Sequence, residues 1–96
     1  MANFTVQLTG PAIRDLEGLP APVRAGVLSS LSGLQNDPLP GGQSVKKLKG
    51  FRFPLYRLRS GNHRILYRID RNILTVMRIA DRKDLEKTIK RLKPLN

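Results

Sequence analysis

Two stretches of alternating side chains on either side of a short turn constrain the fold more than any other part of this chain. Residues 56–59 read Tyr-Arg-Leu-Arg, and residues 64–69 read Arg-Ile-Leu-Tyr-Arg-Ile. Residues 60–63 between them are Ser-Gly-Asn-His, so the segment predicts an antiparallel β-hairpin with a four-residue loop. This loop length places Arg59 directly opposite Arg64.

The alternation gives the predicted hairpin one apolar face and one basic face, because successive side chains of a strand point to opposite sides. The apolar face, which we expect the helices to cover, carries Tyr56, Leu58, Ile65, Tyr67 and Ile69. The basic face carries Arg57, Arg59, Arg64 and Arg68 around Leu66, and Arg78 of the next strand is expected to join it. Like charges opposite each other destabilise a sheet. The basic face is therefore either a solvated surface whose long side chains spread apart, or a phosphate site in which the ligand relieves the repulsion.

The rest of the chain predicts an α+β fold with the element order β-α-α-β-β-β-α. Residues 4–8 alternate like a half-buried strand, and residues 11–19 and 23–34 place apolar side chains at helical spacing. Prolines separate these two helices. We expect one domain, residues 1–96, in which a mainly antiparallel four-stranded sheet packs on the helical hairpin of residues 11–35.

The C-terminal half predicts the third strand of a meander and a final helix. A Pro/Gly-rich loop at residues 39–44 precedes the meander, and residues 73–79 follow a second turn at residues 70–72. Asp81 is placed to cap the last helix, which Pro94 closes. The apolar stripe of that helix is Leu85, Ile89 and Leu92.

Positive charge is confined to one half of the sequence. Residues 1–45 carry a net charge of −1 (2 − 3), and residues 46–96 carry +12 (16 − 4). Such a concentration of like charge favours a polyanionic partner, of which nucleic acid is the commonest. The absence of Cys excludes disulfides and thiolate metal sites, and the single histidine leaves no His cluster, so we expect no cofactor and no metal. Without a secretory signal or a membrane span, we expect a cytoplasmic protein.

Several basic residues outside the hairpin strands are further candidates. Lys46, Lys47 and Lys49 form a basic run that we expect in a loop, where it is solvated or steers phosphates. His63 at the turn is expected to be a turn or stacking residue. Arg82 follows the third strand of the meander and is placed to reach the basic face.

The motifs of this chain resemble those of the RelE/ParE toxin superfamily. The resemblance lies in residues 47–50 (Lys-Leu-Lys-Gly), in the whole hairpin of residues 56–69, and in residues 78–84 (Arg-Ile-Ala-Asp-Arg-Lys-Asp). It extends to residues 12–20, where family members carry an alanine, a basic-acidic pair and Leu-Pro between the helices. The resemblance covers nearly the whole chain.

This resemblance implies a RelE-like toxin of a bacterial type II toxin–antitoxin system, with a RelB-like antitoxin as its partner. RelE-like members cleave mRNA on the ribosome without a metal, by attack of a ribose 2′-hydroxyl on the neighbouring phosphate. Carried over, the catalytic residues are Arg57 and Arg59 (orientation and a base-like role), Arg64 (phosphate stabilisation) and Arg82 (transition state or leaving group). The RNA-binding residues are then expected to be Lys46, Lys47, Lys49, His63, Arg68 and Arg78.

The chain departs from the RelE pattern near its last helix. Many members have a His before the arginine that matches Arg82, and a Tyr a few residues later; here Asp81 takes the first place, and residues 85–88 are Leu-Glu-Lys-Thr. The resemblance therefore implies slower cleavage than in members that keep both residues. Two alternatives stay open: a ParE-like inhibitor of DNA gyrase on the same scaffold, and a nucleic-acid-binding protein without catalysis.

Overall fold

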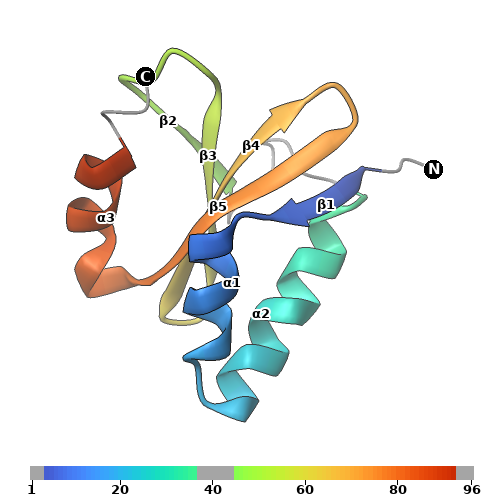
Figure 1. Cartoon of the computed structure of the whole chain (residues 1–96), viewed down its shortest axis with the longest axis vertical. Helices are drawn as coiled ribbons and strands as arrows, with labels where there is room; N and C mark the ends of the chain where they lie inside the picture. Colours follow the sequence, from blue (N-terminus) through green and yellow to red (C-terminus); the bar gives the residue numbers. More distant parts are fainter. Residues whose placement is uncertain (1–3, 37–44, 93–96) are drawn as a thin grey trace.

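The structure, a computed structural model, describes residues 4–36 and 45–92 and confirms the α+β class (Figure 1). Its elements, in chain order, are β1 (Thr5–Leu8), α1 (Gly10–Glu17), α2 (Ala21–Leu34), β2 (Val45–Leu48), β3 (Leu55–Ser60), β4 (His63–Asp70), β5 (Ile73–Asp81), the 3₁₀ turn η1 (Arg82–Asp84) and α3 (Leu85–Leu92). The strands form one sheet in the order β1-β5-β4-β3-β2. Strand β1 is parallel to β5, and the other three pairs are antiparallel.

Within the described residues the sheet has five strands, and the prediction of four was wrong because the basic run before the hairpin is itself a strand. Strand β2 lies at the sheet edge, with Val45 opposite Leu58 and Leu48 opposite Leu55. These apolar pairs hold the ends of a strand whose two central residues are lysines. Lysines on an edge strand discourage pairing with another chain, so a short charged segment is stable in this position.

The predicted register of the central hairpin is confirmed, although its turn is tighter than expected. Arg59 lies opposite Arg64, and Tyr56 lies opposite Tyr67. Ser60 also pairs with His63, so the turn contains only residues 61–62. Gly61 has φ +58°, a left-handed conformation that glycine adopts without steric cost and that tight hairpin turns require.

Helices α1 and α2 cover the apolar face of the sheet, as the alternation predicted (Figure 1). The rings of Tyr56 and Tyr67 stack with centroids 5.5 Å apart in this core. The buried residues of the cluster are Ala12, Val27, Leu31, Leu34, Tyr56, Leu58, Ile65, Tyr67, Leu74, Val76 and Ile79. Thr9 caps α1 by accepting the Ala12 N–H at 3.2 Å, and Pro20 stands at the start of α2.

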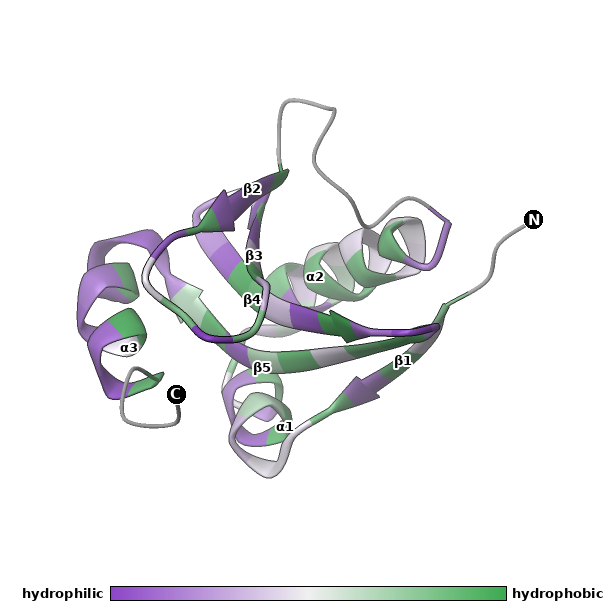
Figure 2. Ribbon diagram, turned by 90° about the horizontal axis from the view of Figure 1, so that it is seen from above, coloured by the Kyte–Doolittle hydropathy of each residue, from purple (hydrophilic) through white to green (hydrophobic). Residues whose placement is uncertain are grey.

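Helix α3 packs on part of the opposite face and creates a second, smaller core. Its buried residues are Leu55, Leu66 and Leu92, and the partly buried Leu85 and Ile89 of α3 pack against them. Figure 2 shows the hydrophobic residues of α3 turned toward the sheet and its hydrophilic residues turned outward. The predicted stripe is thus confirmed, whereas the expected loop at residues 39–44 and the helix end at Pro94 lie outside the described residues.

The predicted cap of the last helix is confirmed in a modified form. The Asp81 carboxylate accepts the Lys83 N–H at 3.0 Å, but the residues that it caps form η1, which leads into α3. Among the helices that the structure describes, none is long and apolar enough to cross a membrane.

Candidate phosphate-binding site

Four arginines from three elements converge at the β3–β4 turn: Arg57, Arg59, Arg64 and Arg82, called the arginine cluster below. The register of β3 and β4 places the first three on the face opposite the α1–α2 core. Burial lowers the pKa of the Arg64 guanidinium, and the positive charges of Arg57, Arg59 and Arg82 lower it further. The negative charge of Asp81 raises this pKa, but its effect is the smallest of those acting on Arg64. The arrangement is therefore a site of concentrated positive charge.

Arg64 lies at the base of the cluster and is the most deeply buried of the four. Only 9% of the residue is exposed. Its Nη1 donates hydrogen bonds to the backbone oxygens of Gly61 and His63, both at 3.0 Å. These two bonds hold the guanidinium against the turn, so the fold fixes the position of its positive charge.

Arg57 carries a buried donor in its side chain. Its Nε is shielded from solvent and has no hydrogen-bond acceptor within the described parts of the chain. A buried N–H without an acceptor costs free energy, and an oxyanion bound in the cluster would remove that cost. Arg57 is thus arranged for a ligand oxygen.

Arg82 reaches the cluster because η1 is attached to the hairpin turn. The Arg82 N–H donates to the backbone oxygen of Asn62 at 2.8 Å, which ties the end of β5 to the β3–β4 turn. The Asp81 carboxylate caps η1 itself by accepting the Lys83 N–H. The sequence prediction that Arg82 reaches the basic face agrees with this geometry.

Only Lys46, of the three lysines predicted to contact RNA, shares a face of the sheet with the cluster. Lys46 lies opposite Arg57, so the two side chains share a face. Lys47 lies opposite Tyr56 and starts from the other face of this edge strand, and Lys49 follows the end of β2. All three lysines are exposed.

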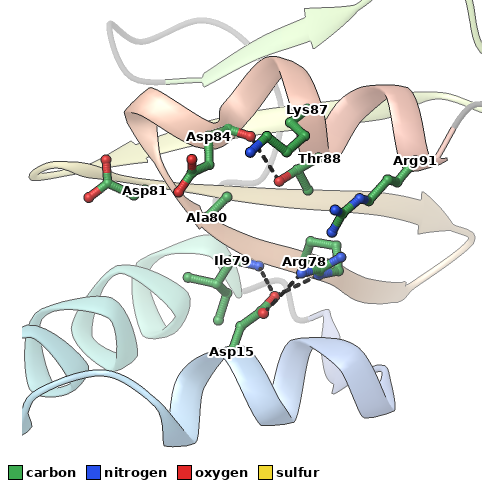
Figure 3. Close-up of a pocket in the computed structure, with 9 residues that line it drawn as sticks. All are labelled: Asp15, Arg78, Ile79, Ala80, Asp81, Asp84, Lys87, Thr88 and Arg91. Carbon is green, nitrogen blue, oxygen red and sulfur yellow. Dashed lines mark hydrogen bonds and ion pairs between the residues drawn. The ribbon is translucent and has the colours of Figure 1, made fainter.

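Arg78 lies opposite Leu66, on the face that the sequence predicted, but its guanidinium is paired with Asp15 and not grouped with the cluster. A β-bulge between β4 and β5 pairs Leu66 with Arg78 but Tyr67 with Val76, so Met77 is an extra residue. The Arg78 guanidinium donates to both carboxylate oxygens of Asp15, at 2.7 and 3.1 Å. Figure 3 shows Asp15 reaching from α1 to Arg78 and to the N–H of Ile79, which it accepts at 2.9 Å. The bulge and this ion pair direct Arg78 to α1.

The same ion pair forms the floor of a polar cleft of about 300 Å³ between α1, β5 and α3 (Figure 3). Arg91 of α3 points toward Arg78 across this cleft, and Lys87 lines it together with Asp81 and Asp84. Its walls therefore carry both signs of charge, unlike the arginine cluster. The ion pair of Asp15 with Arg78 could not be predicted from the sequence, because the two residues lie 63 positions apart.

Arg68 and His63 also lie apart from the cluster. The Arg68 guanidinium stacks on the ring of Phe53, 4.5 Å from its centroid. His63 immediately precedes Arg64 on β4, so its side chain starts from the opposite, helix-covered face, where it lines a small cavity with Val23 and Gly26 of α2. The side chains of these two residues are thus engaged elsewhere, that of Arg68 at Phe53 and that of His63 on the side of α2.

The chemistry available to the cluster is electrostatic. Guanidinium groups bind and stabilise phosphate oxygens but are poor bases. Within residues 4–36 and 45–92, no group of three His, Cys, Asp or Glu side chains is placed to hold a metal ion.

Comparison with known proteins now assigns the family. The family model described as the ParE toxin of the type II toxin–antitoxin system parDE matches residues 6–86. Toxin RelG of Mycobacterium tuberculosis is 36% identical over 86 residues, which cover 85% of this chain and 94% of RelG. The chain belongs to the RelE/ParE toxin superfamily. This confirms the resemblance in the motifs. The matches include both a ParE family model and a RelE-type toxin, RelG.

Solved structures of RelE toxins share the fold of this toxin. The toxin–antitoxin complex RelBE2 of M. tuberculosis contains a chain that is 30% identical with a TM-score of 0.73, covering 83% of this toxin and 99% of that chain. The archaeal RelE–RelB complex of Pyrococcus horikoshii contains a chain that is 24% identical with a TM-score of 0.72, covering 83% of this toxin and 96% of that chain.

Proposed function

We propose that this toxin is a RelE-like endoribonuclease that cleaves mRNA on the ribosome without a metal ion and so inhibits translation in the cytoplasm. The observation that carries the proposal is the convergence of four arginines at the β3–β4 turn, with Arg64 buried among them. This burial of positive charge is unfavourable for the fold alone. A phosphate group in the cluster offsets that cost.

The reaction that fits such a site is an internal transfer of the RNA phosphate. The ribose 2′-oxygen forms a bond to the adjacent phosphorus while the bond from phosphorus to the 5′-oxygen breaks. The products are a 2′,3′-cyclic phosphate and a 5′-hydroxyl; the 2′-hydroxyl loses its proton, and the leaving 5′-oxygen gains one. Negative charge grows on the phosphorane oxygens, and fixed cations lower the barrier at that point.

The geometry supports tasks for two of the four arginines. Arg64, held by the turn, stabilises the phosphorane, and the unsatisfied Nε of Arg57 binds a phosphate oxygen. The resemblance to RelE toxins implies that Arg59 orients the ribose and phosphate and that Arg82 acts on the side of the leaving group. Because the cluster contains no strong base, placement of the 2′-hydroxyl in line by the ribosome accounts for most of the rate.

The proposed partner in the resting state is an antitoxin of the RelB type. The solved relatives are complexes of RelE with RelB, and the basic half of this toxin carries +12 against −1 for the other half. An acidic antitoxin segment that covers Arg59 and Lys46 would neutralise this surface and block the cluster. Its association would be fast and would weaken with salt.

Programmed ribosomes provide the test. We expect the purified toxin to cleave ribosome-bound mRNA in the presence of EDTA and to leave a 2′,3′-cyclic phosphate, whereas free mRNA is cleaved much more slowly. A gyrase supercoiling assay is run in parallel. Intact mRNA with inhibited supercoiling would show a ParE-like toxin, and RNA that is retarded in a gel while both assays stay unchanged would show a binding protein without catalysis.

A further inference from the structure

The segment between β2 and β3 places two aromatic rings beside exposed lysines. Phe51 and Phe53 lie with ring centroids 5.9 Å apart and their planes tilted by 46°. Both are partly buried against the core under α3. Gly50 precedes them with φ +89°, which lets the chain turn sharply at the end of β2.

The two phenylalanines differ in what surrounds them. Phe53 has one ring face occupied by the guanidinium of Arg68, 4.5 Å from the centroid. Phe51 instead lines an open hollow of about 410 Å³, whose other lining residues are Lys47, Leu48, Lys49 and Gly50. The hollow thus combines an aromatic ring, an aliphatic side chain and two cations, and none of its described lining residues is acidic.

This hollow continues the basic surface that begins at the arginine cluster. Lys46 lies opposite Arg57 on the face of the cluster, and Leu48 of the hollow starts from that same face, whereas Lys47 starts from the other face of this edge strand. Lys49 and Phe51 then extend the same edge beyond the end of the strand. A flexible, negatively charged strand that leaves the cluster along β2 therefore arrives at the hollow.

We propose that this hollow is a nucleotide subsite for single-stranded RNA, in which a base stacks on Phe51 while the flanking phosphates contact Lys47 and Lys49. The inference rests on the proposed function, which makes RNA the substrate. Proteins bind single strands by this combination of aromatic platforms and cations that follow the backbone. The volume of the hollow, about 410 Å³, lies within the range of small-ligand sites and is enough for one nucleotide.

Binding of a short 2′-O-methyl oligouridylate, which cannot be cleaved, tests the subsite without relying on catalysis. Phe51→Leu keeps an apolar side chain but removes the ring, and we expect it to weaken binding by roughly 5- to 150-fold. Phe53→Leu is the matched control, because it makes the same change in the neighbouring ring that Arg68 covers; we expect a change of about twofold or less. Phe51→Tyr restores the ring and is expected to restore the affinity.

Oligomers with an abasic nucleotide at each position in turn identify the stacked base. At one position, the abasic nucleotide should weaken binding to the unsubstituted toxin about as much as Phe51→Leu weakens binding of the intact oligomer. Phe51→Leu should bind that abasic oligomer no more weakly than the unsubstituted toxin does. Equal weakening by the two Leu variants, no sensitive abasic position, or no binding by the unsubstituted toxin would overturn the subsite. These results are independent of the ribosome assay. If Phe51→Leu binds the oligomer normally and the toxin cleaves mRNA on ribosomes, only the subsite is contradicted. If the binding results are as expected but mRNA on ribosomes stays intact, only the proposed cleavage is contradicted.

Discussion

At the scale of single residues, Arg64 combines a structural task with the proposed catalytic one. It braces the β3–β4 turn through two hydrogen bonds and carries a positive charge that burial and three neighbouring arginines oppose. Arg64→Met keeps the aliphatic part of the side chain and removes the charge. We expect cleavage on ribosomes to fall by about 100-fold, the loss typical of one electrostatic group in a transition state.

The stability of the same variant should change little. Loss of the two turn hydrogen bonds lowers the stability, and relief of the repulsion from Arg57, Arg59 and Arg82 acts in the opposite direction. Thermal unfolding measures the difference. Arg14→Met is the control, since it removes one positive charge from α1, away from the cluster. If Arg64→Met unfolds the protein while the remaining folded fraction cleaves normally, the role of Arg64 is structural only.

At the scale of elements, η1 links the sheet to α3 and depends on the carboxylate of Asp81. The Lys83 N–H lowers the pKa of this carboxyl below its ordinary value of 3.8, with smaller contributions from the charges of Lys83, His63 and Arg82. A lowered pKa in the folded state means that the carboxylate stabilises the protein above pH 3.8. This contribution is lost as the pH falls through the folded-state pKa.

We therefore expect Asp81→Ala to lower the melting temperature at pH 7 and to have a smaller effect in acid well below pH 3.8, where the unsubstituted carboxyl becomes protonated. Amide hydrogen exchange in residues 82–85 should become faster, and cleavage should fall because Arg82 loses its fixed position. Asp81→Asn, which retains a capping oxygen, should keep the melting temperature close to that of the parent at pH 7. An Asp81→Ala effect that is equally large at both pH values would exclude the carboxylate as its source.

At the scale of the whole molecule, the division of charge between the two halves should appear as a salt dependence of RNA binding. For single strands, the slope of log affinity against log salt is about −0.7 per neutralised phosphate. Lys46→Ala removes a cation beside Arg57, so we expect the slope to become shallower by about 0.7. Lys87→Ala removes the same charge from α3, in the mixed-charge cleft, and should leave the slope unchanged.

Oligonucleotide binding measured between about 50 and 200 mM salt distinguishes these variants. Identical slopes for Lys46→Ala and Lys87→Ala would mean that the charge acts only through a diffuse field. In that case the bound strand does not follow β2.

The central hairpin could be predicted from the sequence because its information is local. Alternation over residues 56–69 fixes which side chains share a face, and one shift of the register would move Tyr67 from the core to solvent. The register of Arg59 against Arg64 follows from that constraint. The two N-terminal helices could likewise be predicted, from the helical spacing of their apolar residues. The confirmed family membership likewise agrees with motifs that are readable in the chain.

Only the tertiary structure decided which basic residues come together. The bulge at Met77 and the carboxylate of Asp15 take Arg78 away from the cluster, and α3 covers Leu66, which sequence alternation had left among the arginines. Strand β2 exists because β3 offers it a partner, which a four-residue segment with two lysines does not reveal by itself. Each of these outcomes depends on contacts between segments far apart in the chain, whereas alternation and capping act between neighbours. The sequence therefore determined the faces of the hairpin, and long-range packing determined how much of its basic face stays open to a ligand.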